Sequence, residues 1–228
     1  AANSNNSFGS YEMELLIQKG DPIMEAKTEG ATRLRLKDII TLSIFNIAML
    51  VIMVIVKMVM TIAATPALDY LFYVGVMAFF CAPLYIVMSN KTAKHGTFLV
   101  TAIFCGLMMA AFGSAWFSAV MLAVGLICEL LMLGNNTYKN PVRNGIGYVV
   151  YWTLYAWGSS IPLFFFKERY LKSLGDSYTE EGKQVLIRFY GSLDMMLLIG
   201  LISAALAAAG FWVGMLFFKK HIQKAKLA

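Results

Sequence analysis

The stretch that decides the fold covers residues 129–166 and reads ELLMLGNNTYKNPVRNGIGYVVYWTLYAWGSSIPLFFF. It contains the end of one apolar run, a polar turn with Lys139 and Arg143 but no acidic residue, and a second apolar run. Lys and Arg in short loops are retained on the cytoplasmic side of a membrane. The turn is therefore expected inside, and the segment that follows it is expected to lead outward.

The second apolar run is unusually rich in hydrogen-bonding side chains. Tyr and Trp usually find hydrogen-bond partners when they are buried, and a helix that faces only lipid has little use for them. We therefore expect this segment to line a ligand site that opens outward. The residues concerned are Tyr148, Tyr151, Trp152, Tyr155, Trp157, Ser159 and Ser160.

The composition indicates an integral membrane protein. The chain has 228 residues, of which 59% are hydrophobic and 14% are charged, and its mean hydropathy is +0.68. Soluble domains average about 25% charged residues. The net charge of +6 requires no nucleic-acid partner, because the basic residues fall where the positive-inside rule places them. Cys81, Cys105 and Cys128 lie inside apolar runs, which favours buried small side chains over disulfides or metal ligands.

The hydropathy pattern predicts an all-α fold of six transmembrane helices in one bundle, in the plasma membrane. Each run approaches the roughly 20 residues that a spanning helix needs. Basic segments flank them so that both the N-terminus and the C-terminus are expected inside. A short amphipathic segment at 177–190 is expected outside, before the last helix. The predicted spans are 39–64, 68–89, 97–113, 115–134, 143–166 and 193–218.

The N-terminal region is expected to lie apart from the membrane domain. Residues 1–30 are polar and rich in Gly, Asn and Ser, which predicts a disordered or vector-derived tail, with Met13 as a candidate native start. Residues 31–228 would then form a single membrane domain.

Catalytic and metal-binding patterns are missing from the sequence. The chain has no HExxH, GxSxG or GxxxxGK[ST] motif, and its two histidines, His95 and His221, have no nearby Cys or carboxylate at ligand spacing. We therefore expect neither an enzyme nor a resident cofactor or metal. Any ATP would be used by partner subunits.

Several roles are open for the charged residues near the ends of the spans, where burying an ionisable group costs free energy and often serves a function. Lys57 can pair with Asp69 at the outer turn, bind a polar or anionic ligand, or extend its ammonium group to the interface. Glu129 is expected to pair with Lys91, Lys139 or Arg143 near the inner surface.

Aromatic and hydroxyl residues gather at the predicted outer ends of several spans. An interfacial aromatic belt explains such residues, and so does an aromatic ligand pocket with a few polar groups. The 15 methionines could add adaptable lining, could in principle ligate a haem iron, or could simply fill the core. The candidate ligand-binding residues are Lys57, Asp69, Tyr73, Trp116, Tyr155, Trp157 and Ser160.

Pairs of small residues four apart occur at 78–82, 106–110, 204–208 and 210–214. Such pairs let helix backbones approach closely. They can serve packing within the bundle or the docking of a partner's helix.

The chain resembles the MptD (Trep_Strep) group of S components from energy-coupling factor (ECF) transporters. The resemblance covers about 33–228, and it depends on the order and spacing of several stretches more than on any one motif. These stretches are RLKDIITLSIFN, PLYIVMSNKTAKHGT, FGSAW, ELLMLGNNTYKNPVRNGIGY and YAWGSSIPLFF.

This resemblance implies a six-helix substrate-binding subunit of an ABC-type importer. Its partners would be an EcfT-type membrane coupling protein and two EcfA-type ATPases, and its ligand a micronutrient held near the outer surface. S components of this kind are thought to topple in the membrane to release the ligand inside. A planar organic ligand, such as haem, a pterin, a thiamin-like compound or a nucleoside, fits the aromatic residues.

One feature departs from the family pattern. Many S components carry AxxxA in the first helix for docking to the coupling protein, whereas this chain has Ser43, Ile47 and Ala48 there. We take Ser43, Ala48 and Glu129 as candidate docking residues. The alternative function is a membrane scaffold or sensor without a transported ligand.

Overall fold

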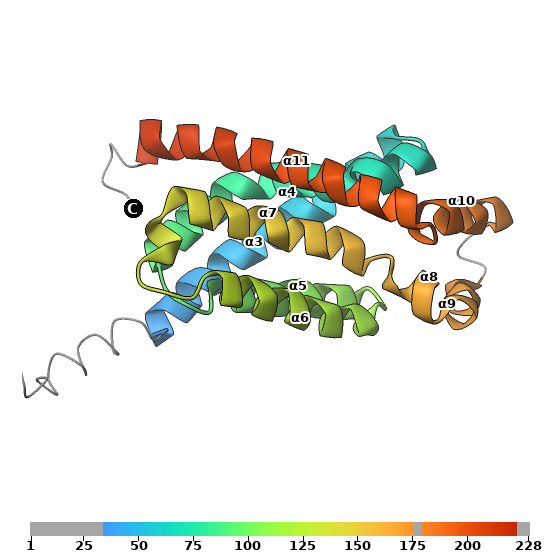
Figure 1. Ribbon diagram of the computed structural model, residues 1–228, viewed down its shortest axis with the longest axis horizontal. Coiled ribbons are helices and arrows are strands. Elements are labelled where there is room, and N and C mark those ends of the chain that lie inside the picture. The colour runs from blue at the N-terminus through green and yellow to red at the C-terminus, as the bar shows by residue number, and fades with distance from the viewer. Residues whose placement is uncertain (1–33, 176–178, 223–228) are drawn as a thin grey trace, which may run out of the picture. The chain divides into compact units, whose positions relative to one another are not determined.

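The computed structural model describes residues 34–175 and 179–222, and all secondary structure in these ranges is helical (Figure 1). The predicted tail at 1–30 and the side chain of His221 lie outside what the structure describes. The elements are α3 (Leu36–Ala63), α4 (Pro66–Thr92), α5 (Thr97–Ala111), α6 (Ala115–Leu131), η1 (Thr137–Lys139), α7 (Pro141–Gly158), α8 (Ile161–Phe165), α9 (Lys167–Leu174), α10 (Glu180–Tyr190), α11 (Leu193–Phe217) and a terminal π-helical turn, η3 (Phe218–Ile222).

Three helices, α3, α4 and α11, are long and apolar enough to cross a membrane by themselves. Helices α5 and α6 are apolar but shorter, and α7 is 18 residues long but carries more polar atoms. The structure thus confirms an all-helical chain with several membrane-length or near-membrane-length helices. The count of six spans stays a prediction.

The helix ends follow local capping rules. Asn140 accepts hydrogen bonds from the backbone amides of Val142 and Arg143 at the start of α7, where Pro141 occupies the first turn. At the end of α6, the Arg143 guanidinium donates to the carbonyls of Leu131 and Leu133 at 3.0 and 2.6 Å. A cation is favourable beside the carbonyls at a helix C-terminus. The basic turn therefore joins α6 to α7 by contacts on both sides.

The fifth predicted span, 143–166, is wrong in its last third. Helix α7 ends at Gly158, a turn follows at Ser159 and Ser160, and α8 begins at Ile161. Pro162 explains the break, because proline has no amide hydrogen to donate and its ring clashes with the carbonyl four residues earlier. A helix within the predicted amphipathic segment is confirmed: α10 begins after a Thr179 cap and buries Leu186 and Tyr190, while its location outside the membrane stays a prediction.

In the bundle, α11 packs against both α4 and α7. Helix α4 packs against α3 and α11, and α7 packs against α6 and α11, while α5 and α6 form a hairpin. The aromatic side chains of α7 that the sequence singles out are buried inside the bundle and not at a lipid-facing surface, namely Tyr148, Tyr151, Trp152 and Tyr155.

Small residues bring α4 and α11 together. A Cβ on Gly210 would lie 2.5 Å from the Cα of Phe79, and a Cβ on Gly214 would lie 2.7 Å from Cδ1 of Ile86. Ala78 and Ala82 are fully buried. The pairs at 78–82 and 210–214 therefore serve packing within the bundle, which is the first of the two interpretations. At 204–208, Ala208 is exposed.

Candidate functional site

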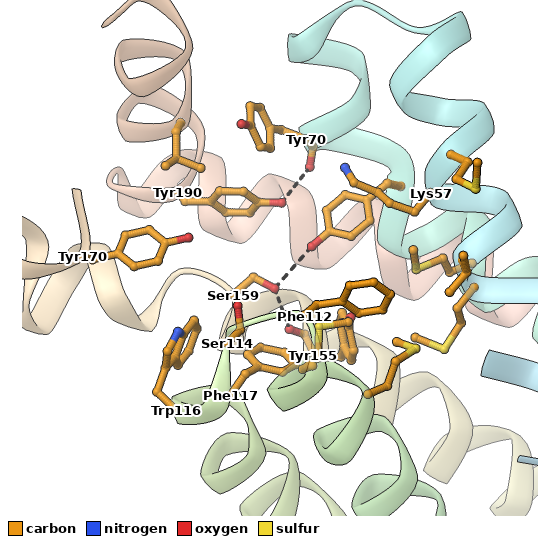
Figure 2. Close-up of a pocket in the computed structure, with 18 residues that line it drawn as sticks. Lys57, Tyr70, Phe112, Ser114, Trp116, Phe117, Tyr155, Ser159, Tyr170 and Tyr190 are labelled. Carbon is orange, nitrogen blue, oxygen red and sulfur yellow. Dashed lines mark hydrogen bonds between the residues drawn. The ribbon is translucent and has the colours of Figure 1, made fainter. Parts of the chain in front are cut away.

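A cavity of about 440 Å³ lies at the end of the bundle where α3 ends, α4 begins and α7 ends (Figure 2). This volume falls within the range of small-molecule sites in proteins, roughly 300–1,000 Å³. Helices α3 to α7, α9 and α10 all contribute to its wall. The lining residues are Met53, Val54, Lys57, Met58, Tyr70, Tyr73, Met77, Met108, Met109, Phe112, Ser114, Trp116, Phe117, Tyr155, Ser159, Tyr170, Leu186 and Tyr190.

Within the described ranges, Lys57 is the one charged residue that lines this cavity. It comes from the last turns of α3, and its ammonium forms an ion pair with Asp69 in the first turn of α4. The same ammonium lies 4.4 Å from the centre of the Tyr73 ring, which is a cation–π distance. The predicted Lys57–Asp69 ion pair is therefore present. It leaves the lining without an uncompensated charge.

The hydroxyl groups of the cavity are partly linked to one another, as the dashed lines in Figure 2 show. The hydroxyls of Tyr73 and Ser159 lie 3.4 Å apart, and the Ser159 hydroxyl also donates to the carbonyl of Tyr155. The Tyr190 hydroxyl donates to the carbonyl of Tyr70 at 3.5 Å. These long hydrogen bonds can exchange for bonds to a ligand at small cost, because they are near the limit of hydrogen-bonding distance.

Methionine and aromatic side chains form the rest of the wall. Methionine is flexible and polarisable, so it adapts its shape to an apolar ligand. Phe117 packs edge-on against Tyr155 at 5.1 Å, and Trp116 packs edge-on against Phe117 at 5.3 Å. The arrangement suits a ligand with a flat apolar body and a few hydrogen-bonding groups. The five methionines are Met53, Met58, Met77, Met108 and Met109.

The structure brings together four of the seven predicted binding residues. Lys57, Tyr73, Trp116 and Tyr155 line the cavity, and Asp69 lies behind Lys57 as its ionic partner. Whether any of them contacts a ligand stays a prediction.

Trp157 and Ser160 are placed elsewhere. The Trp157 indole packs against Gly200 of α11, and its Nε1 donates to the carbonyl of Met196 at 3.1 Å. Ser160 is buried, and its hydroxyl has no hydrogen-bond partner among the described residues. Trp157 lies in the last turn of α7, and Ser160 follows the end of the helix. In the turn after α7, Ser159 lines the cavity and Ser160 does not.

Sequence reasoning missed the contributions of α9 and α10 to the cavity. Tyr170, Leu186 and Tyr190 line it, although this region was expected to be only a soluble connection. The available signal was the apolar face of the 177–190 segment, since an amphipathic helix must cover an apolar surface. Helix α11 supplies none of the lining residues.

The candidate docking residues differ in their surroundings. Glu129 does not pair with a basic side chain among the described residues; its Oε1 accepts hydrogen bonds from the amides of Phe98 and Leu99 and from the Tyr138 hydroxyl. It thus caps the N-terminus of α5, where a negative charge is favourable. Burial raises the pKa of the Tyr138 hydroxyl, and the negative charge of the nearby Glu129 raises it further. Ser43 and Ala48 are half-buried on α3.

Metal-binding geometry is not found in the described ranges, where no three His, Cys, Asp or Glu side chains cluster. The three cysteines are buried free thiols.

Comparison with known proteins gives one finding. The family model for a hypothetical bacterial integral membrane protein, Trep_Strep, matches residues 36–224, which includes every helix that lines the cavity. No curated protein and no solved structure matches the chain. The chain belongs to the Trep_Strep family of bacterial integral membrane proteins.

Proposed function

We propose that this protein is the substrate-capture subunit of an ECF-type ABC importer. In this role the cavity binds a small, largely planar organic micronutrient, and an EcfT-type coupling protein with two EcfA-type ATPases drives its delivery inward. The observation that carries the proposal is the cavity itself: it has a suitable volume, it is lined by aromatic and methionine side chains, and it opens at one end of the bundle.

The distribution of charge supports an outward orientation for this end. The opposite ends of the same helices carry mostly basic side chains, and by the positive-inside rule these belong in the cytoplasm. At the cavity end, the helices α9 and α10 mix both signs of charge. The basic residues of the opposite end are Arg35, Lys37, Lys91, Lys94, Lys139, Arg143, Lys219 and Lys220, accompanied by Asp38 and Glu129.

The lining favours binding over chemistry. Its described residues offer hydroxyls, an indole and one ion-paired ammonium, but no nucleophile beside a general base. The sequence also lacks a nucleotide-phosphate loop. The proposal therefore assigns no catalytic step to this chain, and it assigns ATP hydrolysis to the partner subunits.

The test is co-purification of the tagged chain with the coupling protein and the two ATPases of the same bacterium. The expected result is a stable detergent-solubilised complex that hydrolyses ATP, with a small molecule identified by mass spectrometry in the captured subunit. A chain that stays alone, under conditions where a known S component enters its complex, would contradict the importer role. That outcome would favour the alternative of a membrane scaffold or sensor.

A matched pair of variants tests the predicted docking face. Ser43→Trp places a bulky ring at the candidate docking position on α3, and Leu201→Trp places one on the exposed surface of α11. The first variant is expected to reduce complex formation and the second to leave it unchanged. The opposite result would move the docking face from α3 to α11.

A further inference from the structure

A second cavity adjoins the first one, at the start of α6 and along α9. Its volume is also about 440 Å³, and its lining consists of Trp116, Phe166, Arg169, Tyr170 and Ser173. Trp116 and Tyr170 line both cavities. The two cavities are therefore neighbours that share these two rings as part of their walls.

The second cavity combines three aromatic rings with one guanidinium. The Trp116 ring contacts Phe166 edge-on at 6.3 Å and Tyr170 edge-on at 6.2 Å, so the three rings form a corner. Arg169 belongs to the same wall. Arginine presents a planar fork of donors that matches a carboxylate or phosphate with two parallel hydrogen bonds, and it also stacks on aromatic faces. An aromatic corner with such a fork suits a planar anion.

The charges of the two cavities differ in whether they are compensated. Among the residues that the structure describes, no Asp or Glu lines either cavity. Lys57, the cation of the main cavity, is already paired with Asp69, so a ligand anion there would have to compete with a carboxylate held in place by α4. Arg169 forms no ion pair within residues 34–175 and 179–222. The available positive charge therefore lies in the second cavity.

We propose that the Arg169 cavity is the acid-recognising part of the ligand site, so that the protein selects planar ligands that carry a carboxylate or phosphate over their uncharged counterparts. This inference rests on the proposed function, since it takes the main cavity to hold the ligand's planar body. It goes further by stating the charge of the ligand and the residue that recognises it.

The test compares 2-naphthoate with 2-naphthamide, which have the same ring system and differ in charge. Binding is measured by equilibrium dialysis on the detergent-solubilised full chain. The wild-type protein is expected to bind the carboxylate about tenfold more tightly, as one charge-assisted contact predicts. Arg169→Gln should remove this preference, and Arg169→Lys should keep part of it. Arg188→Gln, at an exposed position of α10 that lines neither cavity, should leave the preference unchanged.

Several results would overturn the inference. These are equal affinities for the two probes in the wild-type protein, a preference that survives in Arg169→Gln, and no saturable binding of either probe. A lipid headgroup could supply the same anionic chemistry, so the assay is repeated in nanodiscs. A preference present in phosphatidylcholine but lost when phosphatidylglycerol is added would assign Arg169 to the lipid and refute the proposal.

Co-purification of the Arg169→Gln protein with the coupling subunits separates this inference from the importer role. If the complex forms but the wild-type protein shows no preference for the carboxylate, only the present inference fails. If the preference is found and no complex forms, the importer role fails and the acid-recognising site stands.

Discussion

The two residues of the Lys57–Asp69 ion pair are expected to differ in how much stability the protein loses when each is replaced. The Asp69 side chain is 11% exposed, whereas the Lys57 side chain is 41% exposed. The second carboxylate oxygen of Asp69 is buried without a hydrogen-bond partner among the described residues. Removing the lysine would thus leave an unpaired, buried carboxylate, whereas removing the carboxylate charge leaves an ammonium that can turn toward water. We expect Lys57→Met to destabilise the protein more than Asp69→Asn does.

The loss of stability expected for Lys57→Met lies between the values known for buried and for exposed ion pairs. Breaking a fully buried pair by deleting one partner costs about 3–5 kcal/mol, and an exposed pair contributes about 0–1 kcal/mol. With one partner buried and the other partly exposed, Lys57→Met should cost about 2 kcal/mol, including its loss of the Tyr73 ring contact. Asp69→Asn should cost less than about 1 kcal/mol. The double variant should be more stable than Lys57→Met alone, because no buried charge remains.

The assay uses the three buried cysteines as reporters. Cys81, Cys105 and Cys128 are buried free thiols, so a maleimide fluorophore reacts with them only on unfolding. For a chain of this size, 1 kcal/mol corresponds to a change in Tm of roughly 2–4 °C. Lys57→Met should therefore lower Tm by about 4–8 °C. Lys183→Met serves as the control, because the partner of Lys183, Glu180, is 84% exposed and the pair should contribute almost nothing.

Two outcomes would refute this reasoning. One is an Asp69→Asn variant at least as destabilised as Lys57→Met. The other is a double variant no more stable than Lys57→Met. Either result would mean that the carboxylate is not the buried partner whose charge must be compensated.

Three further predictions concern helix packing and the membrane. Gly200→Ala puts a Cβ 2.1 Å from Nε1 of Trp157 and should displace the indole. We expect the free energy of unfolding to fall by about 1–3 kcal/mol, measured by the same thiol assay. An unchanged Tm would contradict this packing. Glu129→Ala removes the acceptor at the start of α5 and should lower the free energy of unfolding by about 1–2 kcal/mol. Glu129→Gln keeps an acceptor oxygen and should lower it less. Equal losses in the two variants would argue against the capping role. Trp212 is 66% exposed on α11 and should be quenched by brominated lipids, whereas Trp152 at 4% exposure should not; the reverse order would place α11 away from lipid.

Most of the fold could be predicted from hydropathy because it depends on local composition. The beginnings of α5, α6 and α11 coincide with those of the predicted spans, since an apolar run bounded by polar or Gly residues is itself the signal. The end of α7 was misplaced by hydropathy alone, because the residues beyond Gly158 remain apolar while Pro162 prevents the helix from continuing.

The candidate site was harder to predict, because its members come from helices far apart in the sequence. Four predicted residues line the cavity, since hydrogen-bonding aromatics and a charge at span ends are a local signal. Which side of α7 faces the cavity depends on packing against α6 and α11. Trp157 is therefore directed to Gly200 while Tyr155 lies in the cavity wall. Glu129 illustrates the same limit, since its hydrogen-bond donors are the Tyr138 hydroxyl and two amides 30 and 31 residues away, and not the basic side chains that were expected.

The sequence by itself determined that this is a helical membrane protein with a basic end and an aromatic end, because burial in lipid and retention of Lys and Arg depend on composition along the chain. Only the tertiary structure decided that Lys57 is paired with Asp69, that α9 and α10 complete the main cavity, and that Arg169 and Trp116 line the same second cavity. These contacts depend on the rotation of each helix about its axis. That rotation follows from the close packing of small and large side chains between helices and not from any single run of residues.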